Sequence, residues 1–125
     1  MERAAELYET RLGAPVIRLD SLEAAEFAKL ADMIYRDVNI ALANELAGYA
    51  EEAGLDFEAV REAANTSGEA HLLLPGIGVG GHCTPVYPYF YLRDAERRGG
   101  GAALPNEARR ANEAQAARAV ARPGR

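Results

Sequence analysis

The chain has 125 residues, with 14 basic against 19 acidic side chains and a formal net charge of −5. This length fits one domain with a modest core, and the acidic balance provides no basic surface for nucleic acid. No apolar run approaches the roughly 20 residues of a membrane span, and the charged N-terminal segment lacks signal-peptide features. A single cysteine cannot form an internal disulfide. We therefore expect a cytoplasmic protein with neither a nucleic-acid nor a membrane partner.

The N-terminal stretch predicts a helix over residues 2–12 that ends at Gly13, followed by a strand over residues 15–19. A helix followed by a strand is typical of the end of an α/β unit. The predicted strand has no obvious partner elsewhere in the chain.

A long helix is predicted from residue 22 to about residue 53, with Asp20 as its cap and Glu23 completing a capping box. Thirty-odd residues make a helix of roughly 48 Å, whereas a domain of this size has a radius of gyration of roughly 14 Å. Apolar residues recur along it at helical spacing: Leu22, Ala25, Leu30, Ile34, Val38, Ala41, Leu42, Leu46 and Tyr49. This apolar surface needs a cover, so we expect a homodimer through residues 21–53.

One face of this helix carries Lys29, Met33 and Arg36, spaced at i, i+4 and i+7. Lys29 is the only lysine among the 14 basic residues, and an amine can shift its pKa and take part in proton transfer in a way that a guanidinium does not. The alternative interpretation is a solvated stripe in which Asp32 and Asp37 act as ion partners.

The remaining elements are also helical, so the predicted fold class is mainly α. A second helix runs from a cap at Asp56 to about residue 64, and a third from Pro88 to about residue 98. Residues 99–101 form a glycine hinge. Asn106 is expected to cap a last helix to about residue 121, in which no convincing core-facing stripe is visible.

The stretch over residues 75–85, PGIGVGGHCTP, holds four of the twelve glycines, the only cysteine and one of the two histidines. Glycines let backbone approach a ligand closely, and a thiol beside an imidazole can become a thiolate nucleophile. A plain turn with an inert thiol remains the alternative. Cys83 with His71 and His82 is too small a set for zinc, so no metal is expected.

Three of these glycines also spell G-x-G-x-x-G, the dinucleotide-binding fingerprint. That fingerprint requires a preceding strand, a helix that opens on the loop and an acidic residue about 20 positions later. Pro75 stops the only candidate strand, and the helix would contain Pro85 and Pro88 in its first two turns. The later position falls in the glycines of residues 99–101. A small free-standing nucleotide binder is therefore the least favoured hypothesis.

Two stretches together resemble a known family. One reads AEFAKL, YRDVNIA and ANEL within residues 25–46, and the other reads PGIGVGGHCTPV over residues 75–86 and closes with PY at residues 88–89. In this order and separation they resemble the central domain of the UDP-glucose/GDP-mannose dehydrogenase family, which are NAD-dependent nucleotide-sugar 6-dehydrogenases. The wording is most similar to the branch that acts on UDP-N-acetylhexosamines such as N-acetylmannosamine. The resemblance spans about residues 21–98.

The resemblance implies three segments. Residues 1–20 would be the C-terminal remnant of a Rossmann-type NAD domain, residues 21–104 an all-helical central dimerisation domain, and residues 105–125 the start of a helix leading to a C-terminal domain. NAD would be bound by a domain absent from this chain. The resemblance therefore implies a UDP-sugar substrate, a role in polysaccharide biosynthesis and no activity for this fragment alone.

In the family, the C6 alcohol loses a hydride to become an aldehyde, a cysteine thiolate adds to it, and a second hydride transfer leaves a thioester that water hydrolyses to a uronic acid. By resemblance, Cys83 is the nucleophile and Lys29 handles proton and oxyanion charge. The resemblance also implies these substrate-binding residues: Arg36, Asn39, Gly78, Gly80, Gly81 and His82.

The chain departs from the family pattern at four positions. Met33 stands where the family has an asparagine that holds the oxyanion or the water, and Tyr87 where it has an aspartate that supports water activation. Glu69 replaces an arginine that reaches a substrate across the dimer, and Ile77 replaces a proline. Losing one oxyanion donor costs roughly 10²–10³ in rate, so we predict a slow enzyme or one that stalls as the thioester. The alternative is a non-catalytic homodimerisation module, the remnant of a decayed enzyme.

Overall fold

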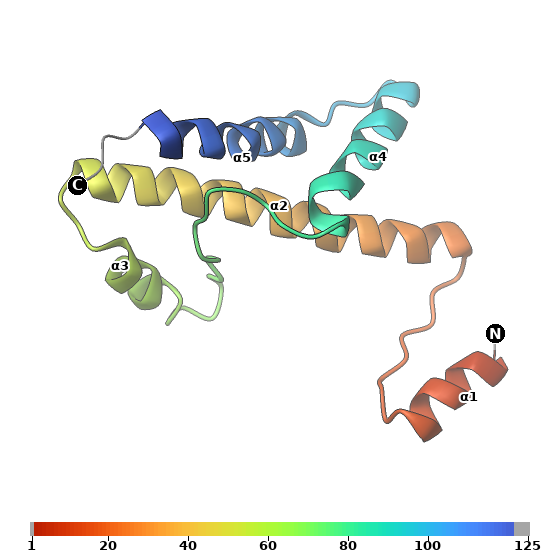
Figure 1. Cartoon of the computed structure of the whole chain (residues 1–125). Helices are drawn as coiled ribbons and strands as arrows, with labels where there is room; N and C mark the ends of the chain where they lie inside the picture. The colour runs from red at the N-terminus through yellow and green to blue at the C-terminus, as the bar shows by residue number, and fades with distance from the viewer. Residues whose placement is uncertain (1, 122–125) are drawn as a thin grey trace.

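The structure, a computed structural model, describes residues 2–121. It contains five helices, and no strand is assigned among these residues. The helices are α1 (Glu2–Arg11), α2 (Leu22–Glu52), α3 (Phe57–Ala64), α4 (Cys83–Arg97) and α5 (Ala103–Ala121). Figure 1 shows α2 as the axis on which the later helices are arranged. The predicted mainly α class is confirmed; residues 122–125 of the predicted linking segment lie outside the described residues.

The long helix α2 spans 31 residues, as its uninterrupted helix-forming sequence predicts. Its cap is Ser21, whose extended backbone lets the side-chain oxygen accept from the N–H of Ala24 at 3.0 Å. The prediction of Asp20 as the cap is therefore wrong by one residue. At the other end Gly54 takes a φ of 69°, a conformation that favours glycine, and the chain turns toward α3.

Helix α5 packs along α2 and runs in the same direction (Figure 1). The buried residues of α5 are Ala108, Arg109 and Asn112. The helix therefore has a core-facing side although its sequence shows no convincing core-facing stripe. The inward residues are small or polar, so they produce no apolar stripe in the sequence. The helix also starts three residues before the predicted cap at Asn106, because Pro105 fits its first turn.

Helix α4 begins at Cys83, five residues before the predicted start at Pro88. Pro85 lies in the first turn, where backbone N–H groups have no intrahelical partner, so a proline costs little there. Pro88 lies inside the helix and is fully buried. Its missing N–H removes the bond to the carbonyl of Thr84, a single bond near the helix start. The expectation that two prolines prevent a helix here is therefore wrong.

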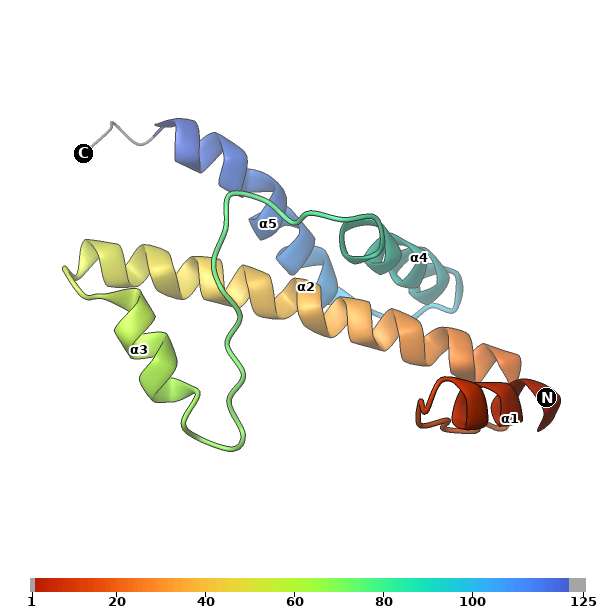
Figure 2. The same cartoon turned by 60° about the horizontal axis from the view of Figure 1, so that its bottom comes forward.

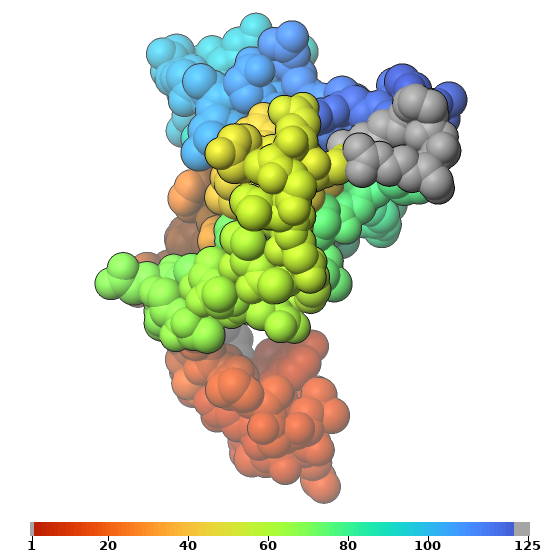
Figure 3. Space-filling model, turned by 90° about the vertical axis from the view of Figure 1, so that its left-hand side faces the viewer, coloured from red at the N-terminus to blue at the C-terminus, as the bar shows by residue number. Residues whose placement is uncertain are grey.

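The predicted strand over residues 15–19 is not formed, because no partner strand exists among the described residues. Helix α1 ends before Gly13, which has a φ of 60°, and the chain then runs extended to α2. Pairwise helix packing joins α2 to α3, α4 and α5, and α4 to α5, but does not include α1. Side chains of α1 and of the start of α2 line one pocket. Figure 2 shows α1 overlapping the start of α2 in that view, and Figure 3 shows the N-terminal segment projecting from the rest of the molecule.

Candidate functional site

The site residues gather where the chain passes from an extended segment into α4. Residues 70–82 cross α2 in both views of the ribbon and then enter the helix (Figures 1 and 2). Gly81 has a φ of 87°, so this position requires a glycine-like backbone. The predicted site residues Gly78, Gly80, Gly81 and His82 are exposed, and the half-buried Cys83 opens α4.

The turn of α2 that carries Lys29 lies against the start of α4, because the side chains of Met33 and Thr84 are in contact. Tyr87 lies one turn after Cys83 on α4. The Cys83 thiol is the largest cause that raises the pKa of Tyr87, and the positive charge of Lys29 acts to lower that pKa. Lys29 is exposed, and its ammonium lies 3.4 Å from Asp32, as the solvated-stripe interpretation predicted.

Met33, one turn after Lys29, is only 5% exposed and packs beneath the start of α4. The hydroxyl of Thr84 donates to the Met33 sulfur at 3.6 Å. Asparagine here would offer a donor, whereas the thioether can only accept. The floor of the site is therefore an apolar thioether between Lys29 and the thiol-bearing turn.

The other two predicted substrate residues lie on α2. Arg36 is exposed. Asn39 is buried, and its amide nitrogen donates to the carbonyl of His71 at 2.6 Å and to the hydroxyl of Tyr35 at 3.1 Å. Its amide oxygen accepts from the N–H of Leu73 at 3.0 Å. Asn39 thus holds the segment that leads to the glycines, and its contact with a sugar stays a prediction.

A buried ion pair that the sequence interpretation missed lies between α2 and α5. Asp37 is fully buried, and its carboxylate accepts from Arg109 at 2.7 Å and from Asn112 at 2.9 Å. Burial raises the pKa of the Asp37 carboxyl, while the charge of Arg109 opposes that rise. The expectation that Asp37 belongs to the solvated stripe is therefore wrong. The only signal in the sequence was an aspartate one position before an apolar helix stripe residue, Val38.

Two negative findings apply to residues 2–121. In this part of the chain, no three side chains of the histidine, cysteine, aspartate or glutamate type are grouped so that they could hold a metal ion. None of the helices described there combines the length and the apolar character needed to cross a bilayer.

Comparison with known proteins identifies the family. Residues 23–114 match the UDP-glucose/GDP-mannose dehydrogenase family, central domain. The chain is 44% identical to the UDP-N-acetyl-D-mannosamine dehydrogenase of Pyrococcus horikoshii over 115 residues, which are 90% of this chain and 27% of that protein. It is 43% identical to the protein of the same name from Methanocaldococcus jannaschii over 95 residues, 76% of this chain and 22% of the relative.

Solved structures agree. The UDP-D-ManNAc dehydrogenase of Pyrococcus horikoshii superposes with a TM-score of 0.72 at 44% identity, over 78% of this chain and 22% of that one. The NDP-N-acetyl-D-galactosaminuronic acid dehydrogenase of Methanosarcina mazei gives 0.71 at 32% identity, over 80% of this chain and 23% of that one. The chain therefore belongs to the UDP-glucose/GDP-mannose dehydrogenase family. It spans about a quarter of the length of the relatives it matches.

Proposed function

We propose that this chain is the central, thiol-bearing domain of an NAD-dependent nucleotide-sugar 6-dehydrogenase that oxidises the C6 alcohol of a UDP-sugar to a uronic acid. The observation that carries this proposal is the contact between Met33, one turn after Lys29, and Thr84, next to Cys83, which sets the lysine-bearing turn of α2 against the thiol-bearing start of α4. Membership of the family and relatives named as UDP-N-acetyl-D-mannosamine dehydrogenases support the same substrate class. Such an enzyme works in the cytoplasm.

The proposal assigns roles only to residues of this chain. The Cys83 thiolate adds to the C6 aldehyde: a sulfur–carbon bond forms, and the carbonyl π pair moves to the oxygen. The exposed ammonium of Lys29 stabilises that oxyanion or protonates it. NAD supplies hydride acceptance. The described residues offer it no strand that leads into a glycine turn, so they do not fit NAD, and we assign NAD to a Rossmann-type domain outside residues 21–104.

Hydrolysis of the thioester is the step that this site supports least. Met33 offers no donor, and the hydroxyl of Tyr87 is a far weaker base than the carboxylate of an aspartate. An enzyme with these residues is therefore expected to accumulate the thioester on Cys83. Intact-mass spectrometry of the full-length protein after turnover tests this expectation, and steady production of uronic acid with no adduct contradicts it.

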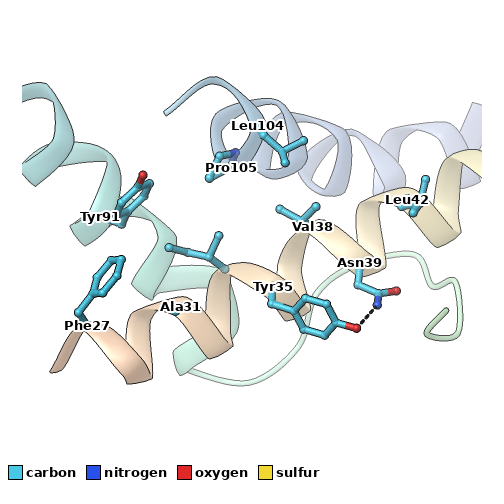
Figure 4. A pocket seen from close by; sticks show the side chains of 10 residues that line it. Phe27, Ala31, Tyr35, Val38, Asn39, Leu42, Tyr91, Leu104 and Pro105 are labelled. Atoms are coloured by element: carbon cyan, nitrogen blue, oxygen red, sulfur yellow. Dashed lines mark hydrogen bonds between the residues drawn. The ribbon is translucent and has the colours of Figure 1, made fainter. Parts of the chain in front are cut away.

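Dimerisation belongs to the same proposal. A groove of about 420 Å³ lies along α2, between α4 and the start of α5. Figure 4 shows its lining side chains, with Phe27 and Tyr35 on α2 and Tyr91 on α4. Phe27 and Tyr35 are each 56% exposed, and Leu42, further along the groove, is 45% exposed. A second copy of α2 is the cover that we propose for this groove.

The rate of Cys83 alkylation by iodoacetamide, a neutral reagent, tests the catalytic proposal. The proposed role of Lys29 requires its charge to favour the thiolate, so Lys29→Met should slow alkylation roughly three- to tenfold at neutral pH. Arg93→Gln is the matched control, because Arg93 is an exposed cation on α4 more than two turns from the thiol. Equal rates for wild type and Lys29→Met would remove the support for a catalytic pair.

A second function is supported by the same two substitutions. Met33 and Tyr87 fit a homodimerisation module whose chemistry has decayed. That reading predicts a dimer whose Cys83 alkylation ignores Lys29. Sequencing the source DNA in frame on both sides of this segment separates the two functions further, because the enzyme requires a strand–GxGxxG–helix unit upstream and a further domain downstream.

A further inference from the structure

The segment that leads into the glycines is held by asparagine side chains instead of by a neighbouring strand. Asn39 binds the carbonyl of His71 and the N–H of Leu73. Asn65 binds both the N–H and the carbonyl of Leu72, at 2.7 and 3.0 Å. An asparagine amide offers a donor and an acceptor in one plane, so it can replace the peptide group of a partner strand.

Asn44 makes the last of these contacts, at the first glycine. Its amide oxygen accepts from the N–H of Gly76 at 2.8 Å. Its amide nitrogen points the other way, into the interface with α5, and donates to the side-chain oxygen of Asn112 at 3.2 Å. Asn44 is only 6% exposed and Asn112 only 3%. Asn44 thus connects the glycine stretch to another helix, which the two other asparagines do not.

The connection continues into the buried ion pair. The amide nitrogen of Asn112 donates to the carboxylate and to the backbone carbonyl of Asp37, both at 2.9 Å. Arg109, one turn earlier on α5, donates to the same carboxylate oxygen. Three groups therefore fix the orientation of the Asn112 amide. The carboxylate and the backbone carbonyl of Asp37 accept from its nitrogen, and the amide nitrogen of Asn44 donates to its oxygen. A shift of α5 relative to α2 must therefore move the Asn112 side-chain oxygen, to which the Asn44 amide nitrogen donates.

We propose that Asn44 is a positioning residue: its amide fixes the position of the Gly76 backbone, and that position depends on how α5 packs against α2. Asn44 and Asn112 do not touch the thiol. Cys83 follows Gly76 by seven residues, so the position of Gly76 also affects the position of the thiol. That this matters for catalysis rests on the proposed function. The amide is planar and bonded at both ends, so turning it to follow Asn112 withdraws its oxygen from Gly76. The Asn44 side chain then couples the packing of α5 on α2 to the position of Gly76, where the thiol-bearing stretch begins.

Hydrogen exchange of the complete chain, followed by mass spectrometry of a peptide over residues 75–83, tests the coupling. Asn112→Ala should speed exchange of that peptide roughly two- to tenfold, the effect of one net hydrogen bond. Asn44→Ala should have at least the same effect, and the double variant should exchange no faster than Asn44→Ala. The rate of Cys83 alkylation should follow the same non-additive pattern. Exchange is expressed relative to a peptide from α2, so that general destabilisation cancels.

Asn65→Ala is the matched control, because Asn65 binds Leu72 and makes no hydrogen bond to α5. Its effect on residues 75–83 should multiply with that of Asn112→Ala. Asn44→Asp and Asn112→Ser repeat the cycle if the alanine variants lose helicity. An unchanged exchange ratio in the Asn112 variant, or multiplying effects of Asn44 and Asn112, would overturn the proposal. The cycle needs no chemistry at Cys83, so it can succeed where the Lys29 alkylation test fails, and the reverse.

Discussion

Two faces of α2, about half a helical turn apart, are built in opposite ways. The face toward α5 buries Asp37 and Asn44, and hydrogen bonds and an ion pair hold these two side chains there. The groove face exposes Tyr35 and Leu42, at 56 and 45%. Soluble domains normally show the reverse, with apolar side chains inside and charges outside.

The difference shows what each face needs. A buried polar group needs its hydrogen-bond partners at fixed distances, so the polar face allows only one packing arrangement of α5. Any apolar cover that removes the groove from water is favourable, which is why we propose a second copy of α2 there. The polar face thus fixes the internal arrangement, and the apolar face is the one that the proposed dimer would use.

Breaking the polar face should give the largest effect. Arg109→Met leaves the fully buried Asp37 without its cation, and an uncompensated buried charge costs about 3–5 kcal/mol. The free energy of unfolding, from urea denaturation followed by circular dichroism, measures this loss. The double variant Asp37→Leu/Arg109→Met removes both charges and should recover most of the stability. A double variant as unstable as Arg109→Met would show that hydrogen bonds, not the charge, dominate this face.

Breaking the apolar face should weaken assembly and leave the fold intact. Leu42→Glu places a carboxylate in the groove, and a two-fold dimer would bury it twice. At about 1–2 kcal/mol for each copy, the dimer dissociation constant should rise roughly a hundredfold. Analytical ultracentrifugation measures it. Val120→Glu is the control, because Val120 is 87% exposed and lies outside the groove lining. Equal constants for the two variants would place the dimer interface elsewhere.

A smaller change sharpens the comparison at the edge of the polar face. Gly48 lies within α2, and a methyl group added there would meet only the end of the Arg118 side chain, at 3.4 Å. That guanidinium is the flexible end of a long side chain, so it can yield. Gly48→Ala should therefore stabilise the chain by about 0.5–1 kcal/mol, the helix preference of alanine over glycine. A lower urea midpoint for this variant would show that α5 is seated too tightly here to move.

The sequence was sufficient for features that depend on local chemistry. The extent of α2 follows from a proline-free run, and the cap of α3 at Asp56 follows from its side chain, which accepts from the N–H of Glu58. The family resemblance named the stretches around Lys29 and Cys83 together, and the structure packs Met33 of the first against Thr84 of the second. Their catalytic roles stay predictions.

Features that depend on distant partners could not be predicted. An extended run at residues 15–19 has the residues of a strand, but a strand also needs a neighbour. The buried side of α5 cannot be recognised in the sequence, because arginine and asparagine are normally solvent-exposed. The burial of Arg109 becomes favourable only through Asp37, which lies 72 residues earlier in the chain. Asn44 and Asn65 gave no signal for the same reason: their partners are backbone groups of a segment without regular structure.

The smallest expected effect is a difference in how the carboxylates of Asp37 and Glu113, the two partners of Arg109, contribute to stability as the pH changes. The hydrogen bond from Tyr89 and then the hydrogen bond and charge of Arg109 lower the pKa of Glu113, so its contribution is present above the unfolded value of 4.5 and is lost as the pH falls. Asp37 has the opposite sign, because burial raises its pKa and its protonated form favours the fold. Glu113→Gln should therefore cost under about 0.5 kcal/mol at pH 7, since the side chain is half exposed. In urea titrations the deficit should shrink as the pH falls below 4.5, and so should that of Tyr89→Phe. A deficit that grows on acidification would show that Glu113 does not act as an ionised partner of Arg109.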